Sequence, residues 1–150
     1  MRAFVCAGAG FLLAVLWFDL MHDVQVLRLP AGENPSAALT SIARYYRRVT
    51  TDARPMNRLV ALVMVATLAF VIAEVIGGDV HPWVAWTSLF LIVAPVAVAA
   101  RRTVPNAVGL GADVHRLTPD HEAVARSIGR DHAFCLASIT ALLVVQLAWG

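Results

Sequence analysis

Four long apolar runs dominate the pattern of hydrophobic and polar positions along this 150-residue chain. They cover about residues 3–21, 59–76, 82–100 and 133–149, and charged residues, glycine or proline bound each of them. A helix needs roughly 20 mainly apolar residues to cross a bilayer, and about 17 can suffice. Pro95 lies inside the third run, where it predicts a kink. The pattern predicts a single all-α domain over residues 1–150, an integral membrane four-helix bundle.

The long connection between the first two runs carries a further helical pattern. Asn34-Pro35-Ser36 is typical of a helix start, with a cap residue followed by proline. Apolar residues then recur at spacings of three and four, at Leu39, Ile42, Tyr46 and Val49. This predicts a cytoplasmic amphipathic helix over about 35–50. Two interpretations stay open: the helix lies on the inner leaflet with its arginines near anionic headgroups, or it packs on the end of the bundle.

The second long connection contains another helix start, at Thr118-Pro119-Asp120, with acid in the first turn. We expect that helix to run through Gly129 into the fourth apolar run. Cys6 and Cys135 both lie inside apolar runs, so we interpret them as buried thiols and not as a disulfide.

Composition and charge support the membrane assignment and predict an orientation. Charged residues make up 15% of the chain and hydrophobic ones 59%, whereas soluble domains carry about 25% charged residues. The basic residues are all arginine, which is typical of bacteria with GC-rich genomes. Only Arg2 lies outside the two long connections, and positive connections stay cytoplasmic. We therefore expect a multi-pass protein of the bacterial plasma membrane with both termini extracytoplasmic. The arginines in those connections are Arg28, Arg44, Arg47, Arg48, Arg54, Arg58, Arg101, Arg102, Arg116, Arg126 and Arg130.

Polar residues near the cytoplasmic boundary are the candidates for chemistry. Asp19, His22 and Asp23 share one face of the first helix, where they predict a metal site or an acid–base pair. The alternative is a helix end that reaches the headgroups and pairs with arginines of the connections. The second connection adds further ligand types, so the weak metal candidates are Asp19, His22, Asp23, His121, Glu122 and His132. Their spacing matches no metal motif, since Ala125 stands where H-E-x-x-H needs its second histidine, and we expect no cofactor.

The remaining intramembrane features have simpler interpretations. Glu74 lies near the outer end of the second run, and we expect it to reach the interface. Gln146 is expected to bond across helices. A stripe of small residues on the first helix favours close packing, within the chain or between chains: Ala3, Ala7, Gly10 and Ala14. The sequence contains no glycine-rich phosphate loop, G-x-S-x-G elbow or C-x-x-C, and no basic–aromatic pattern suited to nucleic acid.

Three short pieces of sequence resemble a known family. They are Gly10-Phe11 through Phe18-Asp19-Leu20-Met21, then Val104-Pro105-Asn106-Ala107, then Arg130-Asp131-His132 leading into the last run. In these the chain resembles the anthrone-oxygenase-like group of small four-helix membrane proteins. It departs from that group at His22, where proline is common, and at Asp131, where asparagine is expected.

The resemblance implies cofactor-free oxidation of a polycyclic phenolic methylene to a ketone, in a pocket for a flat apolar molecule. His132 or His22 would be the base, and Asn106 a donor to the developing oxyanion. We expect Asp19, His22, Asn106 and His132 to meet at one polar opening.

Two other functions remain open on the same residues. One is a non-catalytic accessory subunit that packs against a larger membrane complex or another copy of the chain. The other is a metal-binding membrane protein built on the His/carboxylate candidates.

Overall fold

The computed structural model describes residues 1–28 and 36–150, and this part of the chain contains helices and no strand. Asn34 and Pro35 of the expected helix start lie outside the described residues. The elements, in order, are α1 (Arg2–Leu27), α2 (Ser36–Arg47), η1 (Arg48–Asp52), α3 (Arg54–Gly77), α4 (Pro82–Val98), η2 (Ala99–Thr103), α5 (Val104–Ala112) and α6 (Asp120–Trp149).

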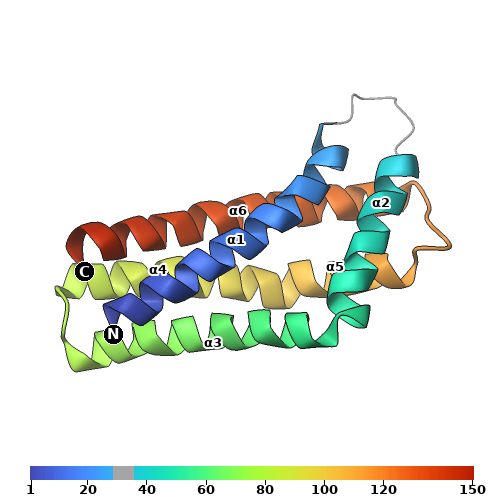
Figure 1. Ribbon diagram of the computed structural model, residues 1–150. Coiled ribbons are helices and arrows are strands. Elements are labelled where there is room, and N and C mark those ends of the chain that lie inside the picture. Colours follow the sequence, from blue (N-terminus) through green and yellow to red (C-terminus); the bar gives the residue numbers. More distant parts are fainter. Residues whose placement is uncertain (29–35) are drawn as a thin grey trace.

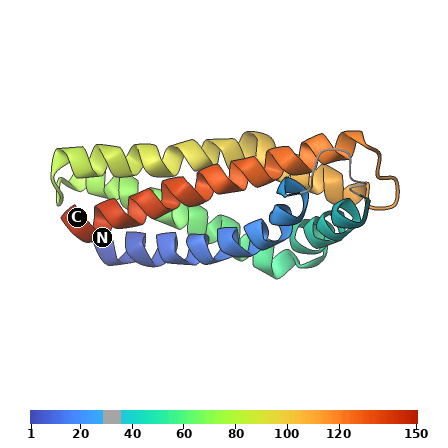
Figure 2. The same ribbon diagram turned by 90° about the horizontal axis from the view of Figure 1, so that it is seen from above.

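Four long helical segments lie side by side as an elongated bundle (Figures 1 and 2). They are Arg2–Leu27, Pro55–Gly77, Pro82–Ala112 and Asp120–Trp149, and each is long and apolar enough to cross a membrane. The expected all-α bundle with four candidate spans is therefore confirmed.

All four segments are longer than their apolar runs, and the third and fourth exceed them most. The third run was expected to end near residue 100, but the helix continues through η2 into α5 as far as Ala112. Helix α4 passes through Pro95 without ending. The fourth segment begins at Asp120 and runs unbroken to Trp149, so the expectation that it passes through Gly129 is confirmed.

The two ends of the bundle differ in construction (Figures 1 and 2). Both chain termini lie at one end together with the short turn between α3 and α4, and we call this the terminal end. Arg2 joins the termini there, because its guanidinium donates to the carbonyls of Leu147 and Gly150, each at 2.7 Å. The opposite end carries α2, η1 and α5, and we call it the α2 end.

Small residues set how closely α1 approaches its neighbours. A side chain at Gly8 would collide with Thr67 of α3, so glycine allows these helices to cross there. The stripe of Ala3, Ala7, Gly10 and Ala14 lies elsewhere on α1 and is exposed.

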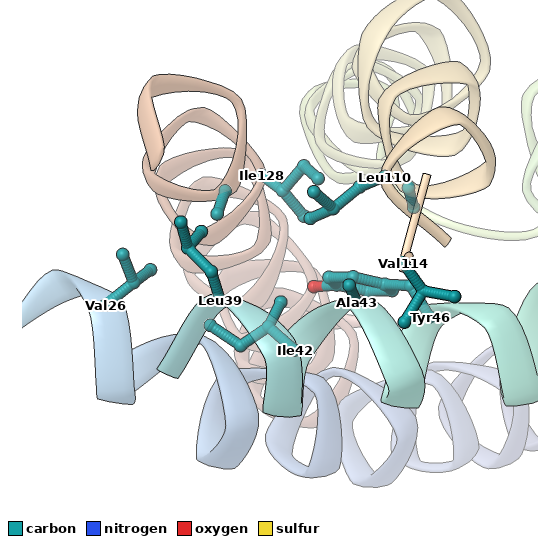
Figure 3. Packing of buried hydrophobic residues seen from close by; sticks show 10 residues of the cluster. Val26, Leu39, Ile42, Ala43, Tyr46, Leu110, Val114 and Ile128 are labelled. Atoms are coloured by element: carbon teal, nitrogen blue, oxygen red, sulfur yellow. The ribbon is translucent and has the colours of Figure 1, made fainter. Parts of the chain in front are cut away.

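The candidate amphipathic helix is docked on the bundle. Leu39, Ile42 and Tyr46 are buried together against side chains of α1, α5 and α6, as Figure 3 shows. The backbones approach closely as well, since a side chain at Gly111 of α5 would meet the backbone of Arg47. The interpretation that this stripe lies in the leaflet is therefore wrong, and packing on the bundle is confirmed. Protein side chains cover the apolar surface that lipid would otherwise cover.

Glu74 corrects a second expectation. Its exposed fraction is 1%, so it does not reach the interface. The amide nitrogen of Gln146 donates to Glu74 Oε2 at 2.8 Å and to Ser88 Oγ at 3.0 Å. Gln146 thus bonds across helices as expected, and this contact holds α3, α4 and α6 together near the terminal end. Cys6 and Cys135 are free thiols as expected; Cys135 is buried, but Cys6 is only half-buried.

The docking of α2 predicts a stability effect. Ile42→Ala should lower the free energy of unfolding by about 2–5 kcal/mol, the usual cost of removing a fully buried aliphatic side chain. Thermal unfolding in detergent, followed by circular dichroism, would measure it. Ser41→Ala, on the exposed side of the same helix, should leave the midpoint nearly unchanged. Equal midpoints for the Ile42→Ala variant and the parent chain would contradict the docking.

Candidate functional site

A buried carboxylate–imidazole pair lies between α1 and α6 at the α2 end. Nδ1 of His132 lies 2.7 Å from Oδ2 of Asp23, and the Asp23 side chain is fully buried. Gly129, almost one turn before His132, makes this approach possible. A side chain there would press on Asp23 and Leu27 of α1.

Helix α2 contributes the third group. The hydroxyl of Tyr46 donates to Oδ1 of Asp23 at 2.5 Å and lies 3.4 Å from His132 Nδ1. Tyr46 belongs to the same buried stripe that docks α2, so its ring lies in the apolar core and its hydroxyl reaches the polar pair. A buried tyrosine hydroxyl ordinarily finds a hydrogen-bond partner, and Asp23 is that partner here.

A second carboxylate lies on the other side of the imidazole. Oδ2 of Asp19 is 3.9 Å from Nε2 of His132, and Oδ1 of Asp19 accepts a 2.6 Å hydrogen bond from the hydroxyl of Tyr45. The Tyr45 ring stacks on His22, with centroids 3.8 Å apart and planes 10° from parallel. His22 is therefore beside the cluster but not hydrogen-bonded to it; its Nδ1 lies 3.0 Å from the carbonyl oxygen of Phe18.

We call Asp19, Asp23, Tyr45, Tyr46 and His132 the acid–base cluster. Burial, together with the neighbouring carboxylates Asp19 and Asp23, raises the pKa of the Tyr45 and Tyr46 hydroxyls above the ordinary value. Both tyrosines therefore remain protonated donors to the carboxylates. When His132 carries a proton on Nδ1, it donates to Asp23. Nε2 then has no hydrogen-bond partner among the described residues, which is the arrangement of a base.

Asp131, the neighbour of His132, serves a different contact. Its carboxylate accepts a hydrogen bond from Thr103 at 3.3 Å and forms an ion pair with Arg102 at 3.1 Å. Arg102 also donates to Ser127 at 3.0 Å. These bonds tie α6 to η2, so Asp131 stabilises the packing of the helices beside the acid–base cluster.

The structure brings together only part of the expected site. Asp19, Asp23 and His132 meet, and His22 contacts the cluster by stacking on the ring of Tyr45. Asn106 lies in the first turn of α5, half-buried, with no hydrogen bond or ion pair to the cluster.

His121 and Glu122 are occupied elsewhere on the chain. His121 contacts Thr118 and Asp113, and Glu122 pairs with Arg126 at 2.8 Å. Within residues 1–28 and 36–150, no three His, Cys, Asp or Glu side chains are arranged to hold a metal ion.

The sequence pattern does not predict the two tyrosines as site residues. It places Tyr46 only in the apolar stripe and gives Tyr45 no role. The available signal was the tyrosine pair at the edge of that stripe, because two phenol hydroxyls on a helix that packs against acidic residues need acceptors.

Two open pockets in the described part of the chain border α2. One, of about 480 Å³, is lined by residues of α1, α2, η1 and the segment after α5: His22, Ser41, Arg44, Tyr45, Arg47, Arg48, Asp52, Val114 and His115. The other borders Ala37, Thr40, Ser41 and Arg44. Neither is lined by His132 or Asn106, and the first has a basic rather than an apolar lining.

Comparison of the chain with protein-family models, with curated proteins and with solved structures finds no match.

The geometry of the cluster predicts strong coupling between Tyr46 and Asp23. Tyr46→Phe removes a donor to a buried carboxylate, and such bonds contribute about 1.5–3 kcal/mol, so unfolding should become easier by that order. Asp23→Asn in the Tyr46→Phe background should cost less than in the parent chain, since the bond to Tyr46 is already gone and only the contact with His132 remains to be lost. Thermal unfolding of the four chains would measure this. Additive effects would show that the two side chains do not interact.

Proposed function

We propose that this chain is a small multi-pass membrane protein that carries an acid–base site, in which His132 is the base and Asp23 orients it. The observation that supports this is the 2.7 Å contact between His132 Nδ1 and Asp23, which leaves Nε2 without a hydrogen-bond partner among the described residues. A carboxylate on one ring nitrogen favours the tautomer in which the other nitrogen is basic. Asp19 would stabilise the imidazolium that forms when Nε2 accepts a proton.

We propose that the substrate is a hydrophobic, flat phenolic molecule that reaches the site through the bilayer. This follows the resemblance to the anthrone-oxygenase-like group. His132 would remove one methylene proton, and the carbanion would take up dioxygen. Loss of water from the resulting hydroperoxide would leave the ketone, so that one methylene and one dioxygen give one carbonyl and one water. Asn106 makes no hydrogen bond or ion pair with the acid–base cluster. The single hydroxyl protons of Tyr45 and Tyr46 are donated to the two carboxylates of that cluster, so we propose no donor to the oxyanion.

We further propose that the α2 end faces the cytoplasm of a bacterial cell. The support is the charge distribution: eleven of the twelve arginines lie in the two long connections at that end.

A second candidate function is that of an accessory subunit. The exposed stripe of Ala3, Ala7, Gly10 and Ala14 favours it, because a side chain added at Gly10 would meet nothing within 4 Å and another helix could approach there. Such a subunit would use the acid–base cluster only to hold its own helices together.

The catalytic proposal predicts that His132→Gln lowers turnover of anthrone by about 10²–10⁴-fold, the usual contribution of a general base. The assay would follow quinone formation and dioxygen consumption by the purified protein, which should be equal in moles. His81→Gln, an exposed histidine near the terminal end, is the matched control and should keep full activity. Turnover that survives in a folded His132→Gln variant would contradict the catalytic proposal and leave the accessory function.

The orientation predicts a labelling pattern in intact cells. In a Cys6→Ser, Cys135→Ser background, a membrane-impermeant maleimide should label Asp79→Cys at once, because the α3–α4 turn would be outside. His115→Cys, at the other end and also exposed, should react only after permeabilisation. The reverse pattern would overturn the orientation.

A further inference from the structure

The exposed side of α2 faces the pocket of about 480 Å³. Ser41, Arg44, Tyr45 and Arg48 recur at spacings of three and four, on the side of the helix away from the buried stripe of Leu39, Ile42 and Tyr46. His22 of α1 and His115 after α5 close the pocket from other elements. Helix α2 therefore packs its apolar face on the bundle and lines a pocket with its basic face.

The charges around this pocket are not balanced within the protein. The side chains of Arg44, Arg47 and Arg48 are exposed and make no hydrogen bond or ion pair with other described residues, and Asp52 is the one acid in the lining. The side chains of Arg101 and Arg130 also lack such partners, but neither residue lines either of these two pockets. What distinguishes the three arginines is that they gather around one hollow of about 480 Å³.

The backbone under these arginines is fixed by specific bonds. From Arg48 to Asp52 the helix widens to the π form, with the Ala53 amide donating to the Arg48 carbonyl at 2.7 Å. The hydroxyl of Thr50 donates to the Tyr46 carbonyl at 2.7 Å, and Asn57 of α3 donates to the Thr50 carbonyl at 2.8 Å. Wide turns of this kind are frequent at functional sites, and here the turn carries Arg48 and Asp52 into the pocket lining.

We propose that this pocket binds a phosphate-type anion, held by Arg44, Arg47 and Arg48. Guanidinium groups suit the task, because their forked donors match phosphate oxygens in pairs and their charge does not titrate. The anion has two sources with the same chemistry: the headgroup of an anionic phospholipid at the membrane boundary, or a soluble phosphate compound. The inference does not rest on the catalytic proposal, since it requires binding and no proton transfer.

The test measures binding by the full-length protein in detergent. Pyrophosphate would be titrated calorimetrically, and native mass spectrometry would count retained phosphatidylglycerol against phosphatidylcholine. Arg44→Gln with Arg48→Gln should weaken binding by about tenfold or more, as expected when charge-assisted hydrogen bonds are lost. Arg101→Gln with Arg130→Gln removes the same charge from exposed residues that do not line the pocket, and it should change binding by less than about twofold, because charges that do not contact the anion are screened by salt.

Weaker binding by an arginine variant could also result from misfolding, so the test includes a variant that should bind more tightly. Asp52→Asn removes the acid from the lining and should tighten anion binding. Arginine-dependent binding of pyrophosphate without a lipid preference would identify a soluble ligand, and arginine-dependent retention of phosphatidylglycerol alone would identify the lipid; both support the site. Equal losses in the two double variants, no binding of either probe, or an Asp52→Asn variant no tighter than the parent would overturn it.

Discussion

The α2 end is organised by the need to pair a carboxylate that α1 carries into the protein interior. An isolated charge in such surroundings costs several kcal/mol, and Asp23 is fully buried. Its partners come from two other helices, Tyr46 of α2 and His132 of α6. The three helices are therefore fixed relative to one another by one side chain. The docking of α2 and the pairing of Asp23 depend on the same residue, because Tyr46 packs its ring in the core and donates its hydroxyl to Asp23.

At the terminal end, too, polar side chains join helices to one another. Between helices in a bilayer the hydrophobic effect is weak, since lipid tails are as apolar as the side chains, so polar contacts and close packing specify the arrangement. Gln146 supplies such a contact to both Glu74 and Ser88, and Arg2 supplies another to the carbonyls that end α6. The apolar middle of the bundle, between these two polar layers, is held by packing around residues such as Val71 and Leu142.

Sequence patterns predicted the elements of this fold well and their contacts only in part. Hydrophobic runs and helix-start signals report on the chain locally, so the four spans, the helix from Ser36 and the unbroken α6 could all be expected. Whether Glu74 reaches the interface depends on what faces it, and no local pattern revealed that Gln146 and Ser88 do. Likewise, the spacing of Asp19 and Asp23 predicted a polar face, but not that two adjacent tyrosines of another helix would bind it.

The direction in which Asn106 points could not be predicted either, because Asn106 follows the π turn η2. A five-residue π turn holds one residue more than the α helix on either side needs, and each α-helical residue advances the screw by about 100°. The residues of α5 are therefore rotated about the helix axis relative to a straight continuation of α4. That shift lets a single long helix present one face to α6 along its first half and a different face to α2 along its second. Deleting one residue within η2 would restore the phase and rotate α5 as a unit, carrying Leu110 and Gly111 away from the helix they now support.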